Sequence, residues 1–235
     1  NYLSYTVALI GNPNVGKSVI FNSLVPGARQ HVGNWSGKTV EKKEGSFVHK
    51  GVQIKLVDLP GTYSLTAAAE DELISRNFIV NSKPDLVVDV LDASNLERNL
   101  YLAYLIAELE VKLLLVLNMN DIAEGKGYKI DTQKLSKQLG IPIVSTIATK
   151  GKGINELKDA IIKTVKDSFI KPKLTYGEKI ESAIADVIEL LKQESAIEQK
   201  YPLRWLAIKL FEKDEQALGI IKNSKNFNKI MEEIN

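Results

Sequence analysis

Cysteine is absent from the sequence of 235 residues, which excludes disulfide bonds and thiolate metal sites and suits a cytosolic compartment. No apolar run approaches the roughly 18 residues that a membrane-spanning helix needs. No block of lysine or arginine stands out and the net charge is +2, so a nucleic-acid partner is not expected. A signal-peptide pattern is also missing at Asn1, so we expect a processed protein or a fragment that is soluble as it stands.

Hydrophobic residues make up 44% of the chain and charged residues 26%, a balance that supports a folded core. The length fits one large domain, or one domain of about 165 residues with an appendage. Apolar runs typical of strands alternate with helical patterns through the first two thirds. The predicted strands are 6–11, a hairpin over 46–58 that turns near Lys50 and Gly51, 85–92, 112–118 and 141–146; the predicted helices start near Lys17 and cover 70–81, 95–110, 132–140 and 154–169.

This alternation predicts an α/β fold with a mostly parallel six-stranded sheet and helices on both faces. In such sheets, ligands bind beyond the carboxyl ends of the strands. The motifs described below all follow predicted strands, so the sequence places them at that edge.

The composition changes after Ile170, where 171–179 looks like a linker and the rest is predicted to be helical. We therefore divide the chain into a domain over 1–170 and a small all-α subdomain over 171–235. In the first tail helix, five apolar residues share one face, namely Ile180, Ile184, Val187, Ile188 and Leu191. Pro202 is expected at the first position of the next helix, which carries Trp205, Leu206 and Phe211.

The stretch GNPNVGKS (11–18) fits the phosphate-loop pattern G-x-x-x-x-G-K-[ST] between a strand and a helix. Its glycines let successive backbone N–H groups point at phosphate oxygens beside a helix N-terminus. Lys17 would add a positive charge at the β and γ phosphates, and the Ser18 hydroxyl would ligate Mg²⁺. We assign nucleotide contacts to Asn12, Pro13, Asn14, Val15, Gly16, Lys17, Ser18 and Val19.

The tetrapeptide DLPG (58–61) follows a predicted strand. Asp58 at the strand end can hold the Mg²⁺ shell through a water, and the Gly61 N–H is placed to meet a γ-phosphate and sense its presence. Such a tetrapeptide is common by chance, but its distance after the phosphate loop makes it informative.

The stretch NMND (118–121) predicts a base site. The Asp121 carboxylate can accept hydrogen bonds from two neighbouring N–H groups; guanine offers that pair and adenine does not, so adenine would leave buried acceptors unpaired. Asn118 would bond the other edge of the base and tie this loop to the phosphate loop. Met119 stands where guanine sites usually have lysine, and its thioether can cover the face of the base.

Residues 145–154 resemble a further guanine-site element, with contacts from Ser145, Ile147 and the Ala148 N–H, which would meet the base oxygen. The alternative is a plain loop between a strand and a helix.

These motifs together resemble a small Ras-like P-loop GTPase domain, and one family in particular. GNPNVGKS, VGNWSGKTVE, DLPGTYSL and NMND are similar to the N-terminal cytosolic domain of the ferrous iron transport protein B (FeoB) family. The linker, PLRWLAIKLFEKD and ERNLYL extend the resemblance over nearly the whole chain. Two residues depart from the pattern: Lys38 replaces a small apolar residue, and Asp89 lies in a strand where asparagine is usual and would need a partner if buried.

The resemblance implies that Thr39 ligates Mg²⁺ when the first switch closes around a γ-phosphate. It also implies a K⁺ site formed by the Asn14 side chain and the backbone carbonyls of Gly33 and Trp35. The alternatives are a loop-stabilising hydrogen bond for Asn14 and an exposed or partner-contacting aromatic side chain for Trp35.

Catalysis raises a separate question, because Thr62 stands where many GTPases have a water-orienting glutamine. We expect Arg29 and Arg76 to be solvated rather than catalytic, and His31 and His49 to lie on the surface. A monovalent cation near Asn14 could supply the positive charge that hydrolysis needs. We therefore assign catalysis to Asn14, Lys17, Thr39 and Gly61.

The resemblance implies a Mg²⁺-dependent, K⁺-stimulated GTPase that binds GTP and GDP at the cytoplasmic face of the cell membrane. Its nucleotide state would regulate Fe(II) uptake by the permease portion of the same protein. The helical subdomain would modulate GDP binding, as a guanine-nucleotide dissociation inhibitor (GDI) does. Two alternatives stay open: a soluble housekeeping GTPase acting on RNA or ribosomes, and a GTP-binding switch with negligible turnover. The oligomeric state also stays open, a homo-oligomer included.

Overall fold

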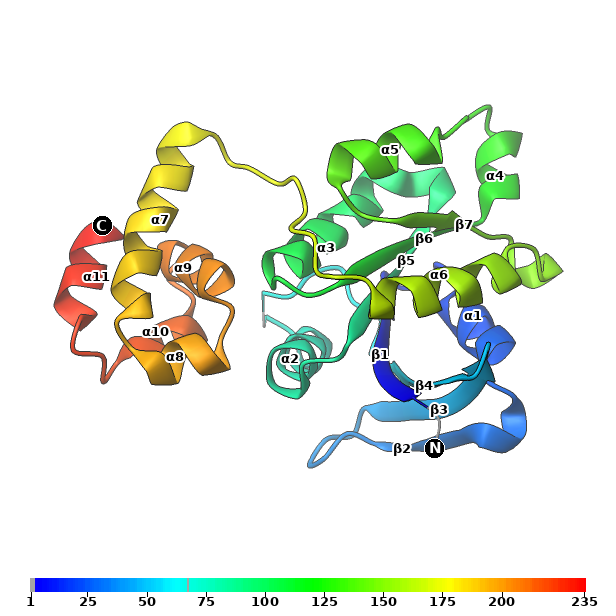
Figure 1. Ribbon diagram of the computed structural model, residues 1–235, viewed down its shortest axis with the longest axis horizontal. Helices are drawn as coiled ribbons and strands as arrows, with labels where there is room; N and C mark the ends of the chain where they lie inside the picture. The colour runs from blue at the N-terminus through cyan, green and yellow to red at the C-terminus, as the bar shows by residue number, and fades with distance from the viewer. Residues whose placement is uncertain (1–2, 67) are drawn as a thin grey trace. The chain divides into compact units, whose positions relative to one another are not determined.

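The structure, a computed structural model, describes residues 3–66 and 68–235 of the chain (Figure 1). It forms two compact units. One takes in most of the chain up to Lys173, and the other comprises Leu174–Asn235 together with Glu108–Glu110. In the described part of the chain, no helix is long and apolar enough to cross a membrane.

The first unit is built on a seven-stranded sheet in the order β2-β3-β4-β1-β5-β6-β7. β4, β1, β5, β6 and β7 run parallel, whereas β2 and β3 are antiparallel to their neighbours. The strands are β1 (Leu3–Gly11), β2 (Gln30–Asn34), β3 (Glu41–His49), β4 (Val52–Asp58), β5 (Leu86–Asp92), β6 (Leu113–Asn118) and β7 (Ile143–Ser145).

The predicted α/β class is confirmed, but the prediction of six strands is wrong. The additional strand is β2, which pairs with β3 at the edge of the sheet. Most of its residues are exposed, so it lacks the buried apolar residues that mark the central strands β1, β5 and β6. The hairpin between β3 and β4 turns at Lys50 and Gly51 as predicted, and both have positive φ (48° and 72°), which suits a tight two-residue turn.

Helices cover both faces of this sheet (Figure 1). Ile20, Phe21 and Leu24 join a buried cluster with Leu157 and Ile161, so the first and last helices of the unit share one core. The helical segments are α1 (Lys17–Leu24), η1 (Gly27–Arg29), α2 (Glu70–Asn77), η2 (Phe78–Ser82), η3 (Ala93–Asn95), α3 (Leu96–Glu108), α4 (Asn120–Gly125), α5 (Thr132–Leu139), η4 (Ala148–Lys150) and α6 (Ile154–Lys166).

The second unit is helical. It contains α7 (Glu178–Lys192), α8 (Ser195–Lys200), α9 (Leu203–Phe211), α10 (Glu215–Ile221) and α11 (Phe227–Glu233). Ile184, Val187 and Leu191 of α7 are buried as predicted, but Ile180 is 52% exposed, so the predicted apolar face does not reach the first turn. Pro202 precedes α9 instead of occupying its first position.

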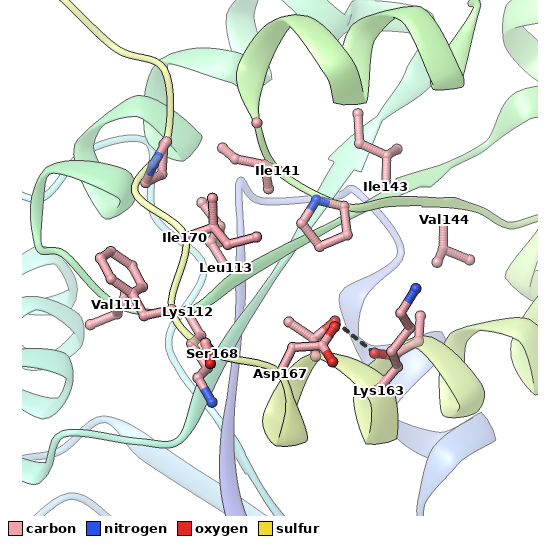
Figure 2. A pocket seen from close by; sticks show the side chains of 16 residues that line it. Val111, Lys112, Leu113, Ile141, Ile143, Val144, Lys163, Asp167, Ser168 and Ile170 are labelled. Atoms are coloured by element: carbon pink, nitrogen blue, oxygen red, sulfur yellow. Dashed lines mark hydrogen bonds between the residues drawn. The ribbon is translucent and has the colours of Figure 1, made fainter.

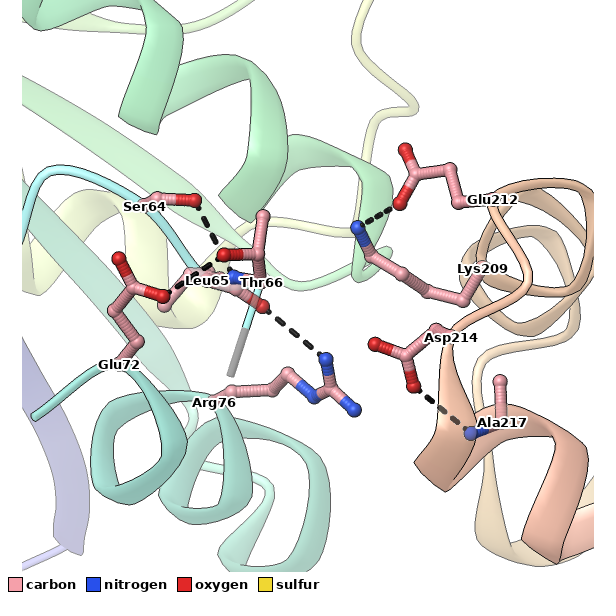
Figure 3. Close-up of polar contacts among 9 residues, drawn as sticks. All are labelled: Ser64, Leu65, Thr66, Glu72, Arg76, Lys209, Glu212, Asp214 and Ala217. Carbon is pink, nitrogen blue, oxygen red and sulfur yellow. Dashed lines mark hydrogen bonds and ion pairs between the residues drawn. The ribbon is translucent and has the colours of Figure 1, made fainter. Parts of the chain in front are cut away.

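The polar contacts of this unit include an ion pair between helices and a helix cap. Arg204 and Glu181 form a two-pronged ion pair at 2.7 Å, which ties α9 to α7. Asp214 accepts the Ala217 N–H at 2.9 Å and so caps α10 (Figure 3).

Candidate nucleotide site

The predicted phosphate loop connects the end of β1 to the start of α1. Asn14 and Gly16 have positive φ (65° and 86°), so the chain turns tightly before the helix. A Cβ on Gly16 would lie 2.3 Å from the Asn118 side-chain nitrogen, so only glycine fits. Ser18 and Val19 lie in the first turn of α1 and are both exposed, and Asn14 is exposed in the loop.

Asn12 differs from the other asparagine of the loop because it is buried, with 4% of its surface exposed. Its side-chain oxygen has no hydrogen-bond partner among the described residues. The buried oxygen of Asn12 therefore adds no hydrogen bond to the loop within the described residues.

Lys17 and Asp58 form an ion pair at the carboxyl ends of two parallel strands. Both side chains are largely buried, at 12% and 13% exposure. Burial raises the pKa of the Asp58 carboxyl, and the positive charge of Lys17 offsets part of that effect. The pair therefore gathers a cation for phosphate oxygens and a carboxylate for a metal shell in one place.

The segment after Asp58 is tied to the phosphate loop by its backbone. Leu59 N–H donates to the Leu9 oxygen at 2.9 Å, and Thr62 N–H donates to the Gly11 oxygen at 3.1 Å. A Cβ on Gly61 would lie 3.6 Å from Pro13, so Gly61 lies beside the phosphate loop.

The Thr62 side chain is turned away from solvent, with 4% of its surface exposed. Its hydroxyl donates to the main-chain oxygen of Ser64 at 2.8 Å. The sequence showed that Thr62 is too short to act like glutamine, and the structure adds that its hydroxyl is used in a local turn.

The predicted first switch forms a hairpin between β2 and β3. Trp35 N–H donates to the Val40 oxygen at 3.0 Å, and the Trp35 carbonyl accepts the Lys38 N–H at 2.9 Å. Gly33 is paired with Lys42 in the sheet, and Thr39 is exposed. Among the described residues, the backbone contacts of Gly33 and Trp35 thus lie within this hairpin and do not extend to Asn14 or Ser18.

Two side-chain contacts join this hairpin to α2 and η2. The Trp35 ring meets the Phe78 ring edge-on, with centroids 5.6 Å apart. Lys38 Nζ lies 3.0 Å from Glu70 Oε1 at the start of α2, which gives the unusual lysine a partner. Neither Phe78 nor the pairing of Lys38 with Glu70 could be assigned from a motif.

Arg76 in α2 corrects one expectation. It is 1% exposed, not solvated, and donates to the main-chain oxygen of Leu65 at 3.3 Å (Figure 3). Thr66 and Glu72 are joined at 2.9 Å beside it. The sequence predicts that Arg76 lies on the helix that follows DLPG (58–61). It does not show that tertiary packing buries the Arg76 side chain. Arg29 is exposed, as is His31, whereas His49 is half-buried against Asp159.

Asn118 at the end of β6 joins the base site to the phosphate loop. Its side-chain N–H donates to the Val15 oxygen at 3.0 Å, which matches its predicted link between the loops. Its oxygen accepts the Thr146 hydroxyl and the Ala148 N–H, both at 3.0 Å. We predicted that the Ala148 N–H meets the base oxygen; in this structure it donates to Asn118.

Asn120, which was not among the predicted residues, and Met119, which was, also shape this site. The Asn120 side-chain nitrogen donates to the Leu117 and Thr146 oxygens at 2.6 and 3.2 Å. Met119 has a positive φ of 61°, and its methyl group lies 3.7 Å from the Cβ position of Gly16. Met119 therefore faces the phosphate loop.

Asp121 lies in the first turn of α4 and is partly exposed. One oxygen accepts the Ile122 N–H at 3.1 Å, and the other accepts Lys150 Nζ at 2.7 Å. The hydrogen bond from Lys150 lowers the pKa of the Asp121 carboxyl. The lowered pKa favours the ionised carboxylate, which can accept hydrogen bonds from a nucleobase on both oxygens. Lys150 was not among the predicted residues, because a lysine in a loop carries no motif.

Asp89 in β5 was expected to need a partner if buried. It is 1% exposed, and its Oδ2 has no hydrogen-bond partner in the part of the chain that the structure describes. Burial raises the pKa of the Asp89 carboxyl well above its usual value. Burial therefore favours the neutral form of this carboxyl over the ionised form.

A cavity of about 310 Å³ opens elsewhere on the first unit (Figure 2). It lies beside the amino end of β6 and the carboxyl end of α6, and its walls include Leu113, Ile141, Lys163 and Ile170. None of its lining residues belongs to the predicted nucleotide site, which lies at the carboxyl ends of the strands.

Comparison with known proteins links the chain to characterised sequences. The family model described as "Ferrous iron transport protein B" matches residues 5–161, and the model described as "FeoB cytosolic helical domain" matches residues 176–235. The Fe(2+) transporter FeoB of Methanocaldococcus jannaschii is 49% identical over 97% of this chain and 33% of its own length. The FeoB of Salmonella choleraesuis is 43% identical over 89% of this chain and 27% of its own length. The chain thus spans about a quarter to a third of these relatives.

Solved structures show the same fold. The cytosolic domain of the T. maritima FeoB iron transporter in a GDP form has a TM-score of 0.85 and 42% identity, covering 94% of this chain and 85% of that one. A GDP-bound point mutant of the S. thermophilus FeoB G-domain has a TM-score of 0.88 and 37% identity, covering 98% of this chain and 87% of that one.

Proposed function

Because the chain belongs to the ferrous iron transport protein B family, we propose that it is the GTP-binding and GTP-hydrolysing cytosolic portion of a ferrous iron transporter. The observation that carries the proposal is the position of Asn118, whose side chain joins the phosphate loop to the base loop. The predicted phosphate loop and the predicted base loop are thereby linked, which supports a single nucleotide site. The GDP-bound relatives support nucleotide binding at this fold.

The residues fit a magnesium ion because Mg²⁺ prefers oxygen ligands. Ser18 offers a hydroxyl in the first turn of α1, and Asp58 offers a carboxylate at the end of β4. Bound Mg²⁺ would neutralise charge that develops on the phosphates. On binding, Lys17 would exchange Asp58 for phosphate oxygens, and Thr39 would reach the metal only after the hairpin turn rearranges.

We assign the K⁺ role to Asn14 because Thr62 cannot orient water and Arg76 donates to the Leu65 oxygen instead of reaching into solvent. The amide oxygen of the exposed Asn14 is a suitable ligand for a monovalent cation. Gly33 and Trp35 would complete the shell once the Trp35 carbonyl releases the Lys38 N–H. The cation would place positive charge near the β and γ phosphates, where hydrolysis needs it. Gly61, beside Pro13, would detect the γ-phosphate.

In the full-length protein, we propose that the nucleotide state regulates Fe(II) uptake through the membrane permease portion at the cytoplasmic face. The domain over 1–170 would carry the nucleotide and the helical subdomain over 171–235 would modulate GDP release. A second candidate is a GTP-binding switch with negligible turnover, which the inward-turned Thr62 hydroxyl favours. Family membership argues against a housekeeping GTPase acting on RNA or ribosomes.

The base assignment is tested by Asp121→Asn. An amide can donate to the O2 of xanthine, so the variant should lose affinity for GDP and gain affinity for XDP, each by about tenfold or more. Equilibrium titration of both nucleotides, with ADP as the reference, measures the change. If Asp121→Asn keeps the GDP preference of the wild type, the proposed base site is wrong.

A further inference from the structure

The loop after β7 presents a lysine to the carboxylate that we assign to the base. Lys150 Nζ donates to Asp121 Oδ2 at 2.7 Å, and the Ile122 N–H donates to Asp121 Oδ1 at 3.1 Å. An ionised carboxylate has about four lone-pair positions in its plane. These donors occupy one position on each oxygen, which leaves one on each for the two neighbouring N–H groups of guanine.

The backbone of this loop fixes where Lys150 starts. Lys150 N–H donates to the Ile147 oxygen at 2.9 Å, and Ile147 and Lys152 exchange hydrogen bonds at 3.1 and 3.2 Å. Behind the loop, a Cβ on Gly153 would lie 2.3 Å from the Ser145 oxygen, so the chain passes too closely for any other residue. Lys150 therefore reaches Asp121 from a loop whose path is set.

Met119 supplies no charged donor beside Asp121. It occupies the position at which guanine sites usually have lysine, and its uncharged side chain faces the phosphate loop. Among the described residues, Lys150 is the only charged group that is hydrogen-bonded to Asp121.

We propose that Lys150 is a positioning residue for guanine specificity, which fixes the Asp121 carboxylate so that each oxygen meets one N–H of the base. Without this contact, the carboxylate can rotate and accept both hydrogens less well. The inference rests on the proposed guanine site and deepens it. Because the pair is 56% and 34% exposed, it contributes little to folding, and its loss acts on recognition.

The test compares GDP with IDP, which keeps the N1 hydrogen of guanine but lacks the N2 amine. Lys150→Met keeps the aliphatic stem and removes the charge, and Lys150→Arg keeps a charged donor. Lys152→Met is the matched control, because Lys152 is an exposed lysine in the same loop. We expect Lys150→Met to reduce the preference for GDP over IDP by about three- to tenfold, as the loss of one good hydrogen bond implies. Lys150→Arg should restore the preference, and Lys152→Met should leave it unchanged.

An unchanged GDP-to-IDP ratio in Lys150→Met would overturn the inference while the guanine site stands. Equal weakening of both nucleotides would overturn it too, because it would mean a general structural role. If the wild type does not prefer GDP to ADP, the proposed function itself fails. Thermal unfolding of each variant confirms that the compared proteins are folded.

Discussion

Asn118 donates a side-chain hydrogen bond to the main-chain oxygen of Val15 at 3.0 Å, although 103 positions separate the two residues in the sequence. The same side chain accepts from Thr146 and Ala148. One buried amide therefore holds three loops of the candidate nucleotide site, and its removal should affect stability and binding together.

Replacement of Asn118 by alanine leaves the Ala148 N–H, the Thr146 hydroxyl and the Val15 oxygen without that partner. We expect the free energy of unfolding to fall by about 3 kcal/mol, because buried polar groups that lose their partners are costly. GDP affinity should fall more than about tenfold. Urea unfolding and GDP titration measure both effects. Asn95→Ala removes an exposed amide and should change stability by less than about 0.5 kcal/mol; equal losses in both variants would contradict the role given to Asn118.

Asp89→Asn should stabilise the protein, and more so at higher pH. Because burial raises the pKa of Asp89, its folded form binds a proton more tightly than the unfolded chain does. The stabilising contribution of the Asp89 proton is therefore fully present below the ordinary pKa of aspartate. It is lost as the pH rises through the raised pKa of the folded protein. Because asparagine has no titratable proton, the variant does not lose stability in this way as the pH rises. Chemical unfolding of both proteins across pH 4 to about pH 8 tests this.

Asp159→Asn is the control for this series, since Lys50 and His49 lower the pKa of that exposed carboxyl. Its stability should show the opposite and much weaker trend. A constant difference in stability between wild type and Asp89→Asn at every pH would contradict the raised pKa of Asp89.

Alanine substitutions at two glycines in one loop distinguish the cost of backbone strain from the cost of steric overlap. Gly151 and Gly153 have positive φ of 65° and 81°, but only Gly153 has an atom within 4 Å of its Cβ position. Gly151→Ala should cost about 1 kcal/mol from strain alone. Gly153→Ala should cost at least about 2 kcal/mol more and weaken GDP binding, because the Ser145 oxygen must move. Equal costs in the two unfolding titrations would refute the close approach.

The sequence predicts what has strong local patterning. Buried runs such as 112–118 are recognisable as strands, and the spacing of glycine, lysine and serine defines the phosphate loop without any tertiary information. The link between Asn118 and that loop is predicted because Asn118 belongs to the recognisable motif NMND. These features are local, so the sequence alone suffices to place them.

The remaining features depend on tertiary contacts. β2 is exposed and polar, so only its pairing with β3 reveals it as a strand. Arg76 is buried by packing that no local pattern encodes, and Lys150 matters because of a residue 29 positions away. Ile180 fits the helical spacing, yet the core of its unit ends one turn later.

Hydrolysis of GTP in K⁺ against Na⁺, by the wild type and Asn14→Ala, tests the mechanism most directly. Asn95→Ala serves as the control, and GDP titration verifies that each variant still binds nucleotide. We expect the wild type and the control to turn over about 10- to 100-fold faster in K⁺ than in Na⁺, since one lost electrostatic contact to the transition state has an effect of this order. Asn14→Ala should be slow in both salts. Equal rates for wild type and Asn14→Ala in both salts would contradict cation-assisted hydrolysis.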